Sequence, residues 1–306
     1  MRRLFPDLDV VHLDAVLPQQ PEDSPDFWPL WLAEIRRHTG ESVDVVFTSE
    51  DYGEELARRL GARHMVADRG RQAVPVSGTA IRADPYAHWR DLPDVVRPYY
   101  CRRVVVFGPE STGKTTLAKN LAGHFNTVWV PEYARGHLDP KGGKCVAADI
   151  PLIAAGQAAS EDALAEQANR VLICDTDLLT TTIWSDVYFG DCPAWICAEA
   201  ENRRYDLHLF CDIDVPWVDD RQRDMPHRRA EFRDRCQAAL VAHGATVVRI
   251  SGSWDERLRT AITAVELLLG PLLSAPPIAA RARVVADMES GIYQEKSAIT
   301  PPGTAP

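Results

Sequence analysis

The strongest chemical pattern in this sequence is a glycine-rich segment that runs from Gly108 to Thr115 and reads Gly-Pro-Glu-Ser-Thr-Gly-Lys-Thr. It matches G-x-x-x-x-G-K-[S/T], the pattern of a phosphate-binding loop, between an apolar stretch and a segment with helical periodicity. Glycines let consecutive backbone N–H groups turn toward a phosphate, and the N-terminus of the following helix adds partial positive charge. We therefore expect the chain to bind ATP or another nucleoside triphosphate through Gly108, Pro109, Glu110, Ser111, Thr112, Gly113, Lys114, Thr115 and Thr116.

Two residues of this loop and two later aspartates are predicted to handle the charge of the triphosphate. Lys114 is expected to bridge the β- and γ-phosphates, and the Thr115 hydroxyl to bind Mg²⁺. A second magnesium ligand is expected from Asp175, which follows a run of four apolar residues. Asp177 lies one strand alternation further on the same side and is a further catalytic candidate. The alternative for Asp175 is a loop cap, because aspartate is common at strand ends.

A carboxylate and a group of arginines are candidates for the transfer step itself. Glu132 follows a predicted strand and is expected to orient or deprotonate an acceptor hydroxyl; the alternative is an ordinary solvated carboxylate. The segment 218–229 is rich in arginine although the chain is acidic, and Arg221 and Arg223 are expected to neutralise charge on the transferred phosphoryl group. The alternative is a solvated helix start with internal Asp–Arg pairs.

Aromatic residues after Asp175 suggest where an acceptor with a ring would lie. Trp184 and Tyr188 are one helical turn apart and could stack on a flat, cationic ring, with Asp186 as a weaker candidate for pairing with its charge. Packing in the core is the alternative for both aromatic residues. Trp254 follows the last predicted strand. In folds with a phosphate-binding loop, the chain after the last strand usually contacts the adenine base, so we expect Trp254 to lie near it.

Phosphate-binding loops occur in several classes of protein, so the loop alone does not decide the function. The sequence contains neither the N-K-x-D pattern of regulatory GTPases nor the Ser-Gly-Gly-Gln signature of transporter ATPases. A carboxylate near the second strand and an arginine-rich lid are instead typical of small-molecule kinases. A nucleotide-dependent regulatory module remains an alternative.

The elements that must position these residues form two successive alternations of strand and helix. Residues 1–98 contain predicted strands at 10–13, 43–47 and 64–66 and helices at 27–38 and 50–60. From residue 99 the pattern is clearer, with apolar strands that predict a parallel sheet covered by helices on both faces. The strands are expected at 103–107, 127–130, 170–174, 206–211 and 246–250. The helices are expected at 115–124, 150–169, 192–204, 228–243 and 253–269. Residues 274–306 show no sustained period and are expected to be a disordered tail.

Composition narrows the class of protein further. The chain has 306 residues, a formal charge of −10, 45% hydrophobic and 25% charged residues. An acidic balance argues against binding to nucleic acid or to an anionic membrane surface. No apolar run is long enough to cross a bilayer, no secretory signal is recognised, and the seven scattered cysteines are typical of reduced thiols. We expect a cytoplasmic protein of two units; a homo-oligomer is compatible with this composition.

Together these residues resemble the NadR family, whose members join a nicotinamide mononucleotide adenylyltransferase domain to a ribosylnicotinamide kinase domain. The resemblance is carried by the segments 47–53, 74–82, 96–99, 108–116, 132–135, 175–177 and 216–218 with Asp220 and Arg223. It implies ATP-dependent phosphorylation of the 5′-hydroxyl of nicotinamide riboside, or of a similar small riboside, for NAD biosynthesis. The implied fold is a P-loop kinase domain with a five-stranded parallel sheet at 99–273. A truncated Rossmann-like nucleotidyltransferase unit is implied at 1–98.

Two departures from the family bear on these expectations. Family members usually have glycine where this chain has Arg221, which places the backbone of the lid in doubt. The adenylyltransferase loop with its H-x-G-H histidines is missing, and the sequence contains no H-x-x-H. We expect the adenylyltransferase activity to be lost; the alternatives are that it is retained, or that a misplaced start codon hides an intact domain upstream.

Overall fold

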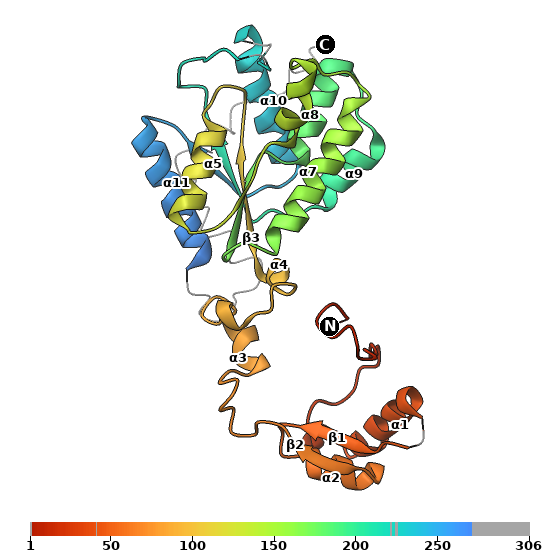
Figure 1. Cartoon of the computed structure of the whole chain (residues 1–306). Helices are drawn as coiled ribbons and strands as arrows, with labels where there is room; N and C mark the ends of the chain where they lie inside the picture. Colours follow the sequence, from red (N-terminus) through yellow and green to blue (C-terminus); the bar gives the residue numbers. More distant parts are fainter. Residues whose placement is uncertain (1, 41, 221, 224–225, 271–306) are drawn as a thin grey trace, which may run out of the picture. The chain divides into compact units, whose positions relative to one another are not determined.

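The computed structural model describes residues 2–40, 42–220, 222–223 and 226–270, and these divide into two compact units between Ala80 and Ile81. The predicted tail at 274–306 lies outside the described residues. Figure 1 labels the elements of both units.

The first unit is built around a two-stranded parallel sheet. Its elements are a 3₁₀ helix (Pro21–Asp23), α1 (Phe27–Thr39), β1 (Val45–Thr48), α2 (Gly53–Leu60) and β2 (Arg63–Val66), and α3 (Gly78–Ala83) spans the division between the units. β1 and β2 pair in register from Val45 opposite Arg63 to Thr48 opposite Val66. Four of the five predicted elements are therefore present, with small shifts at their ends.

The predicted strand at 10–13 is not formed. This segment has no strand assignment and Val11 is about half exposed, at 52%. A short apolar run becomes a strand only when a neighbouring strand accepts its hydrogen bonds, and none pairs with it here. The prediction was wrong because alternation in four residues carries no information about a pairing partner.

The second unit contains a five-stranded sheet in the order β4-β5-β3-β6-β7, in which all neighbouring strands are parallel. This confirms the predicted α/β fold class with its five-stranded parallel sheet. The strands are β3 (Arg102–Phe107), β4 (Trp129–Val130), β5 (Val171–Asp175), β6 (Leu207–Cys211) and β7 (Val247–Ile250). Because β3 is flanked by β5 and β6, the chain reverses its direction of progress across the sheet at β3. Parallel α/β sheets bind ligands at such a switch point, outside the carboxyl ends of the strands.

Helices cover both faces of this sheet. They are α4 (Arg97–Tyr100), α5 (Lys114–His124), α6 (Tyr133–Leu138), α7 (Asp149–Ala165), α8 (Leu178–Phe189), α9 (Ala194–Asn202), α10 (Arg229–Ala242) and α11 (Trp254–Leu269). Short 3₁₀ helices are at Trp89–Asp91, Asp139–Lys141 and Pro226–Arg228. In Figure 1, α5 and α11 lie on one side of the strands and α7 to α10 on the other.

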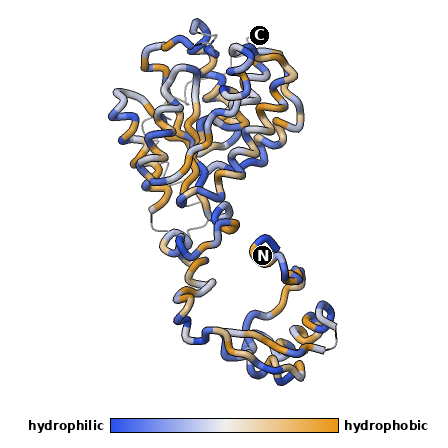
Figure 2. Tube along the Cα trace, viewed as in Figure 1, coloured by the Kyte–Doolittle hydropathy of each residue, from blue (hydrophilic) through white to orange (hydrophobic). Residues whose placement is uncertain are grey.

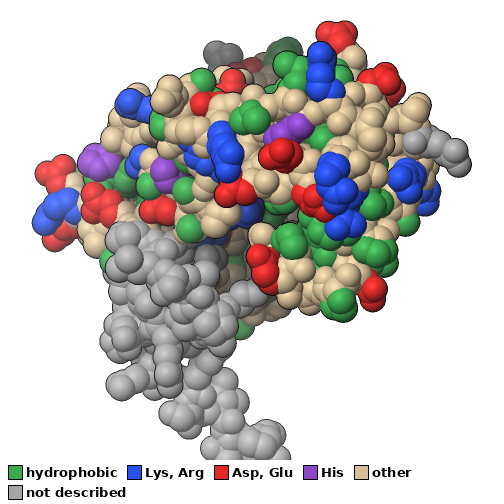
Figure 3. All heavy atoms as spheres, turned by 90° about the horizontal axis from the view of Figure 1, so that it is seen from below, with side chains coloured by type: hydrophobic (Ala, Val, Ile, Leu, Met, Phe, Trp, Pro, Cys, Tyr) green, Lys and Arg blue, Asp and Glu red, His purple; other side chains and the backbone are tan. Residues whose placement is uncertain are grey.

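The core explains why the strands read as continuous apolar runs. Val104 and Val106 of β3 pack toward α5 and α11, whereas Val105 and Phe107 face the opposite layer, and all four are fully buried. A strand buried on both faces needs apolar residues at every position. The tube in Figure 2 is correspondingly hydrophobic along the strands of this unit, while Figure 3 shows basic and acidic side chains intermixed on the visible face.

Residues 81–98, which the sequence analysis assigned to the first unit, belong to the second. Tyr86, Trp89 and Leu92 are buried in the same hydrophobic cluster as Val105 of β3. The Tyr86 hydroxyl also donates to the Tyr100 carbonyl at 3.0 Å. Residues 81–98 are therefore packed against the second unit.

Candidate active site

The phosphate-binding loop connects β3 to α5, and its backbone requires glycine at two positions. Gly108 has φ of +133°, and a Cβ there would lie 2.6 Å from the Cys211 carbonyl oxygen. Gly113 has φ of +82°, and a Cβ there would lie 2.4 Å from the Trp254 ring. Ser111 adopts φ of +59° without being glycine. Such left-handed residues cost energy and cluster at ligand-binding loops, which agrees with the predicted role of this segment.

The loop is held together by its own side chains. The Pro109 carbonyl accepts hydrogen bonds from the Thr112 hydroxyl and from the Lys114 ammonium, both at 2.8 Å. Ser111 accepts from the Val218 backbone N–H at 2.7 Å, which ties the loop to the segment after β6. The Lys114 ammonium is therefore on the inner side of the loop, where a bound phosphate would draw it from the Pro109 carbonyl.

Two arginines anchor the loop from outside it. Sequence reasoning gave Arg257 no role and counted Arg229 among the arginines of the predicted lid. Arg257 of α11 is almost fully buried; it donates to the Thr112 carbonyl at 3.2 Å and forms an ion pair with Asp214. Arg229 at the start of α10 donates to the Ser111 carbonyl at 3.0 Å. These contacts fix the backbone whose N–H groups would meet the phosphates. The available signal for Arg257 was a charged residue on the apolar face of a predicted helix.

Thr115 and Asp175 are brought together as the magnesium prediction requires. The Thr115 hydroxyl donates to Asp175 Oδ2 at 2.5 Å, across the gap between α5 and the end of β5. Asp175 is 1% exposed, and its other oxygen, Oδ1, is buried without a hydrogen-bond partner among the described residues. A buried oxygen of this kind fits a divalent cation, which Mg²⁺ sites satisfy with one or two carboxylates together with nucleotide phosphates and water.

The environment of Asp175 raises its pKa to about 6, from an ordinary value of 3.8. Burial is the largest cause because it disfavours the charged form, and the negative charge of Glu132 adds to it. The Lys114 ammonium and the hydrogen bond from Thr115 act in the opposite direction. Burial disfavours the ionised form of this carboxyl group, and a cation bound beside it would favour that form again.

Two adjoining cavities meet at this point. A phosphate cavity of about 70 Å³ is lined by Ser111, Thr112, Gly113, Lys114, Thr115, Thr116, Glu132, Arg135 and Arg223. An acceptor cavity of about 140 Å³ lies next to it; its lining includes Glu110, Thr176, Trp184 and Tyr188. Lys114, Glu132 and Arg135 line both cavities. A molecule in the acceptor cavity would therefore meet the end of a triphosphate beside Glu132.

The acceptor cavity contains the aromatic pair that the sequence singled out. Trp184 and Tyr188 of α8 stack on each other with ring centroids 5.1 Å apart and an interplanar angle of 19°. Trp184 also packs on Phe232 of α10 at 4.1 Å. The pair therefore contributes both to core packing and to the cavity wall. Asp186 does not face the cavity; it forms an ion pair with Arg235 at 2.9 Å.

An ion-pair chain connects the predicted lid to the N-terminal turn of α6. Arg135 pairs with Glu132 at 3.1 Å and with Asp220 at 3.0 Å, and Asp220 also pairs with Arg223 at 2.9 Å. Arg223 lies at the phosphate cavity. Arg221, the other predicted lid residue, lies outside the described residues. Sequence reasoning did not predict Arg135 as a site residue, although it follows Glu132 by one helical turn.

The structure does not bring Asp177 into either cavity, so its predicted catalytic role is not supported. Asp177 is the N-cap of α8, and one of its oxygens accepts from the Thr180 N–H at 2.8 Å and from the Thr180 hydroxyl at 2.9 Å. The other oxygen lies 3.2 Å from His208 Nε2. Thr176 adopts φ of +71°, which breaks the strand alternation that the prediction assumed.

Trp254 lies at the N-terminus of α11 and is 57% exposed. Its ring contacts Gly113 of the phosphate-binding loop, beside the phosphate cavity instead of within its lining. An exposed indole next to the loop is compatible with the predicted contact to an adenine base.

Residues 103–257, about half of the chain, match a protein-family model described as AAA domain. The chain belongs to the AAA domain family. The match begins in β3 and ends at the buried Arg257, so it covers the phosphate-binding loop, Asp175 and both cavities.

Curated relatives extend the similarity beyond this domain. The chain is 29% identical over 271 residues to "Trifunctional NAD biosynthesis/regulator protein NadR" of Escherichia coli (strain K12), and 28% identical to the protein of that name from Salmonella typhimurium. These alignments cover 85% of this chain and 66% of each relative, so the chain spans just under two thirds of their length. They support the resemblance to NadR.

Solved structures give the same result for the fold. "Crystal structure of NadR protein in complex with NR" matches with a TM-score of 0.71 at 24% identity, over 90% of this chain and 82% of that one. "Crystal structure of NadR protein in complex with NAD and AMP-PNP" matches with a TM-score of 0.69.

Within the described ranges, no helix has the length and apolar character needed to span a bilayer. No group of three or more metal-ligating side chains assembles in those ranges either.

Proposed function

We propose that the second unit is an ATP-dependent kinase that phosphorylates the 5′-hydroxyl of nicotinamide riboside. The observation that carries this proposal is the junction of the two cavities at Lys114, Glu132 and Arg135. A phosphate site alone would equally fit a switch or a motor, whereas a phosphate site that opens onto an aromatic-walled cavity fits transfer to a small acceptor. The names and ligands of the NadR relatives support the choice of acceptor.

In this proposal each residue acts through position and charge. The acceptor oxygen forms a bond to the γ-phosphorus, the bond from that phosphorus to the β,γ-bridging oxygen breaks, and the hydroxyl proton passes to Glu132. Lys114, Arg135 and Arg223 surround the transferred group, so their charges offset the negative charge that spreads over its oxygens. Thr115 and Asp175 would hold Mg²⁺, which supplies further charge neutralisation on the β- and γ-phosphates.

The experiment that tests the proposal is an assay of the full chain with ATP, Mg²⁺ and nicotinamide riboside, with product identified by mass spectrometry. Lys114→Ala is expected to lower the rate by on the order of 10²–10³-fold or more, as removal of a preorganised charge-stabilising contact does. Lys119→Ala is the matched control, because this lysine is an exposed residue of the same helix. Mononucleotide formation that survives Lys114→Ala would show that the site is assigned wrongly.

We also propose that residues before Ile81 do not carry out adenylyl transfer in this chain. The three histidines of the first unit lie with separate partners: His12 with Asp14, His38 with Glu34, and His64 with the Thr48 hydroxyl. Adenylyl transfer by the family's mechanism needs paired histidines at the α-phosphate, and this sequence has no H-x-x-H. Incubation with the mononucleotide and ATP tests this: a substantial yield of NAD contradicts it.

A regulatory ATPase without a small acceptor is the remaining alternative. It predicts that the chain binds ATP but that no riboside accelerates ATP consumption. The assay above decides between the two functions in the same experiment, since ADP and phosphorylated riboside are both measured.

A further inference from the structure

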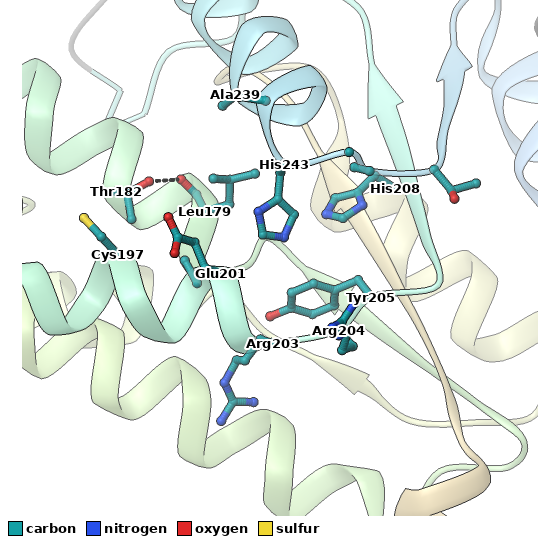
Figure 4. Close-up of a pocket in the computed structure, with 15 residues that line it drawn as sticks. Leu179, Thr182, Cys197, Glu201, Arg203, Arg204, Tyr205, His208, Ala239 and His243 are labelled. Carbon is teal, nitrogen blue, oxygen red and sulfur yellow. Dashed lines mark hydrogen bonds between the residues drawn. The ribbon is translucent and has the colours of Figure 1, made fainter. Parts of the chain in front are cut away.

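The second unit contains another and larger cavity, of about 650 Å³. It lies at the end of the strands opposite to the phosphate-binding loop. Tyr205 and Thr246, which line it, precede β6 and β7, so the cavity lies at the amino ends of these strands. The phosphate-binding loop follows the carboxyl end of the parallel strand β3. Figure 4 shows the side chains of Tyr205, His208, His243 and Glu201 gathered around this space. Its volume is in the range of small-molecule sites.

The charged groups of this cavity favour an anion. Arg204 and His243 line it, and neither side chain has a hydrogen-bond or ion-pair partner among the described residues. Arg203 is different, because it is already paired with Asp162 and Glu199. Glu201 is the one acidic side chain in the lining. Two available cationic or donor groups therefore oppose one carboxylate.

Three carbonyls near the C-terminus of α10, which lies at the cavity, are not open to a cation because they already accept hydrogen bonds. Ala239 O accepts from His243 N at 2.9 Å, Leu240 O from Ala245 N at 3.0 Å, and Val241 O from Gly244 N at 3.1 Å. A helix C-terminus attracts cations mainly through unsatisfied carbonyls. These three carbonyls therefore do not favour a cation over an anion.

A buried histidine adds a hydrogen-bonding requirement. His208 is 2% exposed, and its Nε2 lies 3.2 Å from the Asp177 carboxylate. A carboxylate accepts hydrogen bonds, so in the neutral ring Nε2 carries the proton toward Asp177 and Nδ1 is an acceptor. Nδ1 is buried without a partner among the described residues, although the ring forms part of the cavity wall. A hydroxyl or N–H group of a ligand would satisfy it, with the Tyr205 ring, 5.6 Å from His208, as an adjacent flat surface.

Helix α8 separates this cavity from the acceptor cavity. Leu179 and Thr182 line the larger cavity, whereas Thr180, Thr181, Trp184 and Tyr188 of the same helix line the acceptor cavity. Asp177 caps the N-terminus of α8 and contacts His208. A ligand that engages His208 would therefore act on the cap of the helix that carries the acceptor-cavity residues.

We propose that the larger cavity binds a small organic phosphate with a hydroxylated ring, of the sugar-phosphate class, and that its occupancy changes the affinity of the acceptor cavity through α8. The phosphate pairs with Arg204 and His243, and a ring hydroxyl donates to His208 Nδ1. The predicted change in acceptor affinity rests on the proposed function, in which nicotinamide riboside is the acceptor. The binding of a sugar phosphate in the larger cavity does not rest on it.

Binding is tested by calorimetric titration of ribose 5-phosphate into the full chain, with the phosphate-binding loop saturated by Mg²⁺ and a non-hydrolysable ATP analogue. Arg204→Ala is expected to weaken binding by about fivefold, the upper range for a solvent-exposed charge pair. Ala242→Trp, at an exposed position of the lining, is expected to abolish it. Arg259→Ala removes the same charge from an exposed site on α11 and is expected to have no effect.

The outcomes separate this site from the acceptor cavity. Trp184→Ala leaves the binding of ribose 5-phosphate unchanged if the larger cavity is its site. Absence of binding, or equal binding by wild type, Arg204→Ala and Ala242→Trp, overturns the proposal.

Coupling is tested by titrating nicotinamide riboside with and without saturating ribose 5-phosphate. The proposal predicts at least a severalfold change in riboside affinity that disappears in Ala242→Trp, and the same change in sugar-phosphate affinity when the riboside is bound. An unchanged riboside affinity overturns the coupling. A riboside that does not bind at all contradicts the proposed function instead, while the result for the sugar phosphate stands.

Discussion

Replacing Asp175 by asparagine is expected to stabilise the folded second unit at alkaline pH while it removes the response to nucleotide and magnesium. Folding raises the pKa of Asp175 from 3.8 to about 6, through burial first and repulsion from Glu132 second. For a carboxyl group whose pKa is raised on folding, the unfolded chain ionises more readily. The free energy of unfolding is lowered as a result: the loss is absent well below pH 3.8 and complete well above pH 6.

The size of this penalty follows from the shift in pKa. A difference of roughly two units corresponds to about 3 kcal/mol of lost stability at pH 8, of which about 1.5 kcal/mol is already present at pH 5. Asparagine avoids the penalty, keeps an acceptor for the Thr115 hydroxyl, and introduces a buried amide N–H that costs about 1–3 kcal/mol if unpaired. Because that cost is independent of pH, the advantage of asparagine should grow by about 1.5 kcal/mol between pH 5 and pH 8.

Urea unfolding of the two proteins at pH 5 and pH 8, without nucleotide or Mg²⁺, measures this difference. Asp186→Asn is the control, because this aspartate is an exposed residue of α8 paired with Arg235, and its effect should change little with pH. The same samples with Mg²⁺ and an ATP analogue should show a rise in Tm for wild type and a much smaller one for Asp175→Asn. If the free energies of unfolding of wild type and Asp175→Asn differ by the same amount at both pH values, burial does not raise the pKa of Asp175 as argued.

Three further changes test separate parts of the site. Gly113→Ala is expected to abolish binding of an ATP analogue in calorimetry, since φ of +82° and the Trp254 ring both exclude a Cβ; a second change, Trp254→Ala, should restore binding only in part. Arg257→Met is expected to lower the free energy of unfolding by roughly 2 kcal/mol or more in urea titrations, because buried carbonyls of Thr112 and Asp212 lose their donor. Trp184→Ala is expected to raise the KM for riboside by roughly five- to tenfold with the KM for ATP unchanged, and an equal rise in both would place this residue outside the acceptor cavity.

The parts of the site that sequence could predict are those with local signals. The loop from Gly108 to Thr115 is a contiguous pattern, and Asp175 ends a fully apolar run, so both were placed correctly on the fold. Arg257 contacts Thr112 from a distant part of the chain, and only the folded sheet brings these residues together. Arg229 on Ser111 is a contact of the same long-range kind.

Helix α8 shows a different reason for a missing prediction. Its sequence begins Leu-Leu-Thr-Thr-Thr-Ile, in which the four β-branched residues after the leucines are weak helix formers, and it is stabilised by the Asp177 cap and by packing on both sides. The same aspartate was assigned to catalysis because strand alternation was extended past Asp175, where Thr176 turns into the left-handed region. A cap and a catalytic carboxylate have the same local sequence signal, and only the partners of the side chain distinguish them.

We propose that the loop at Gly108–Thr115, together with Asp175, binds a triphosphate through magnesium. The test is calorimetric titration of a non-hydrolysable ATP analogue into wild type and Lys114→Ala, each with Mg²⁺ and with a chelator. We expect binding by wild type that weakens strongly when Mg²⁺ is removed, and no measurable binding by Lys114→Ala. Equal binding by the two proteins, or binding by wild type that is indifferent to Mg²⁺, would contradict it.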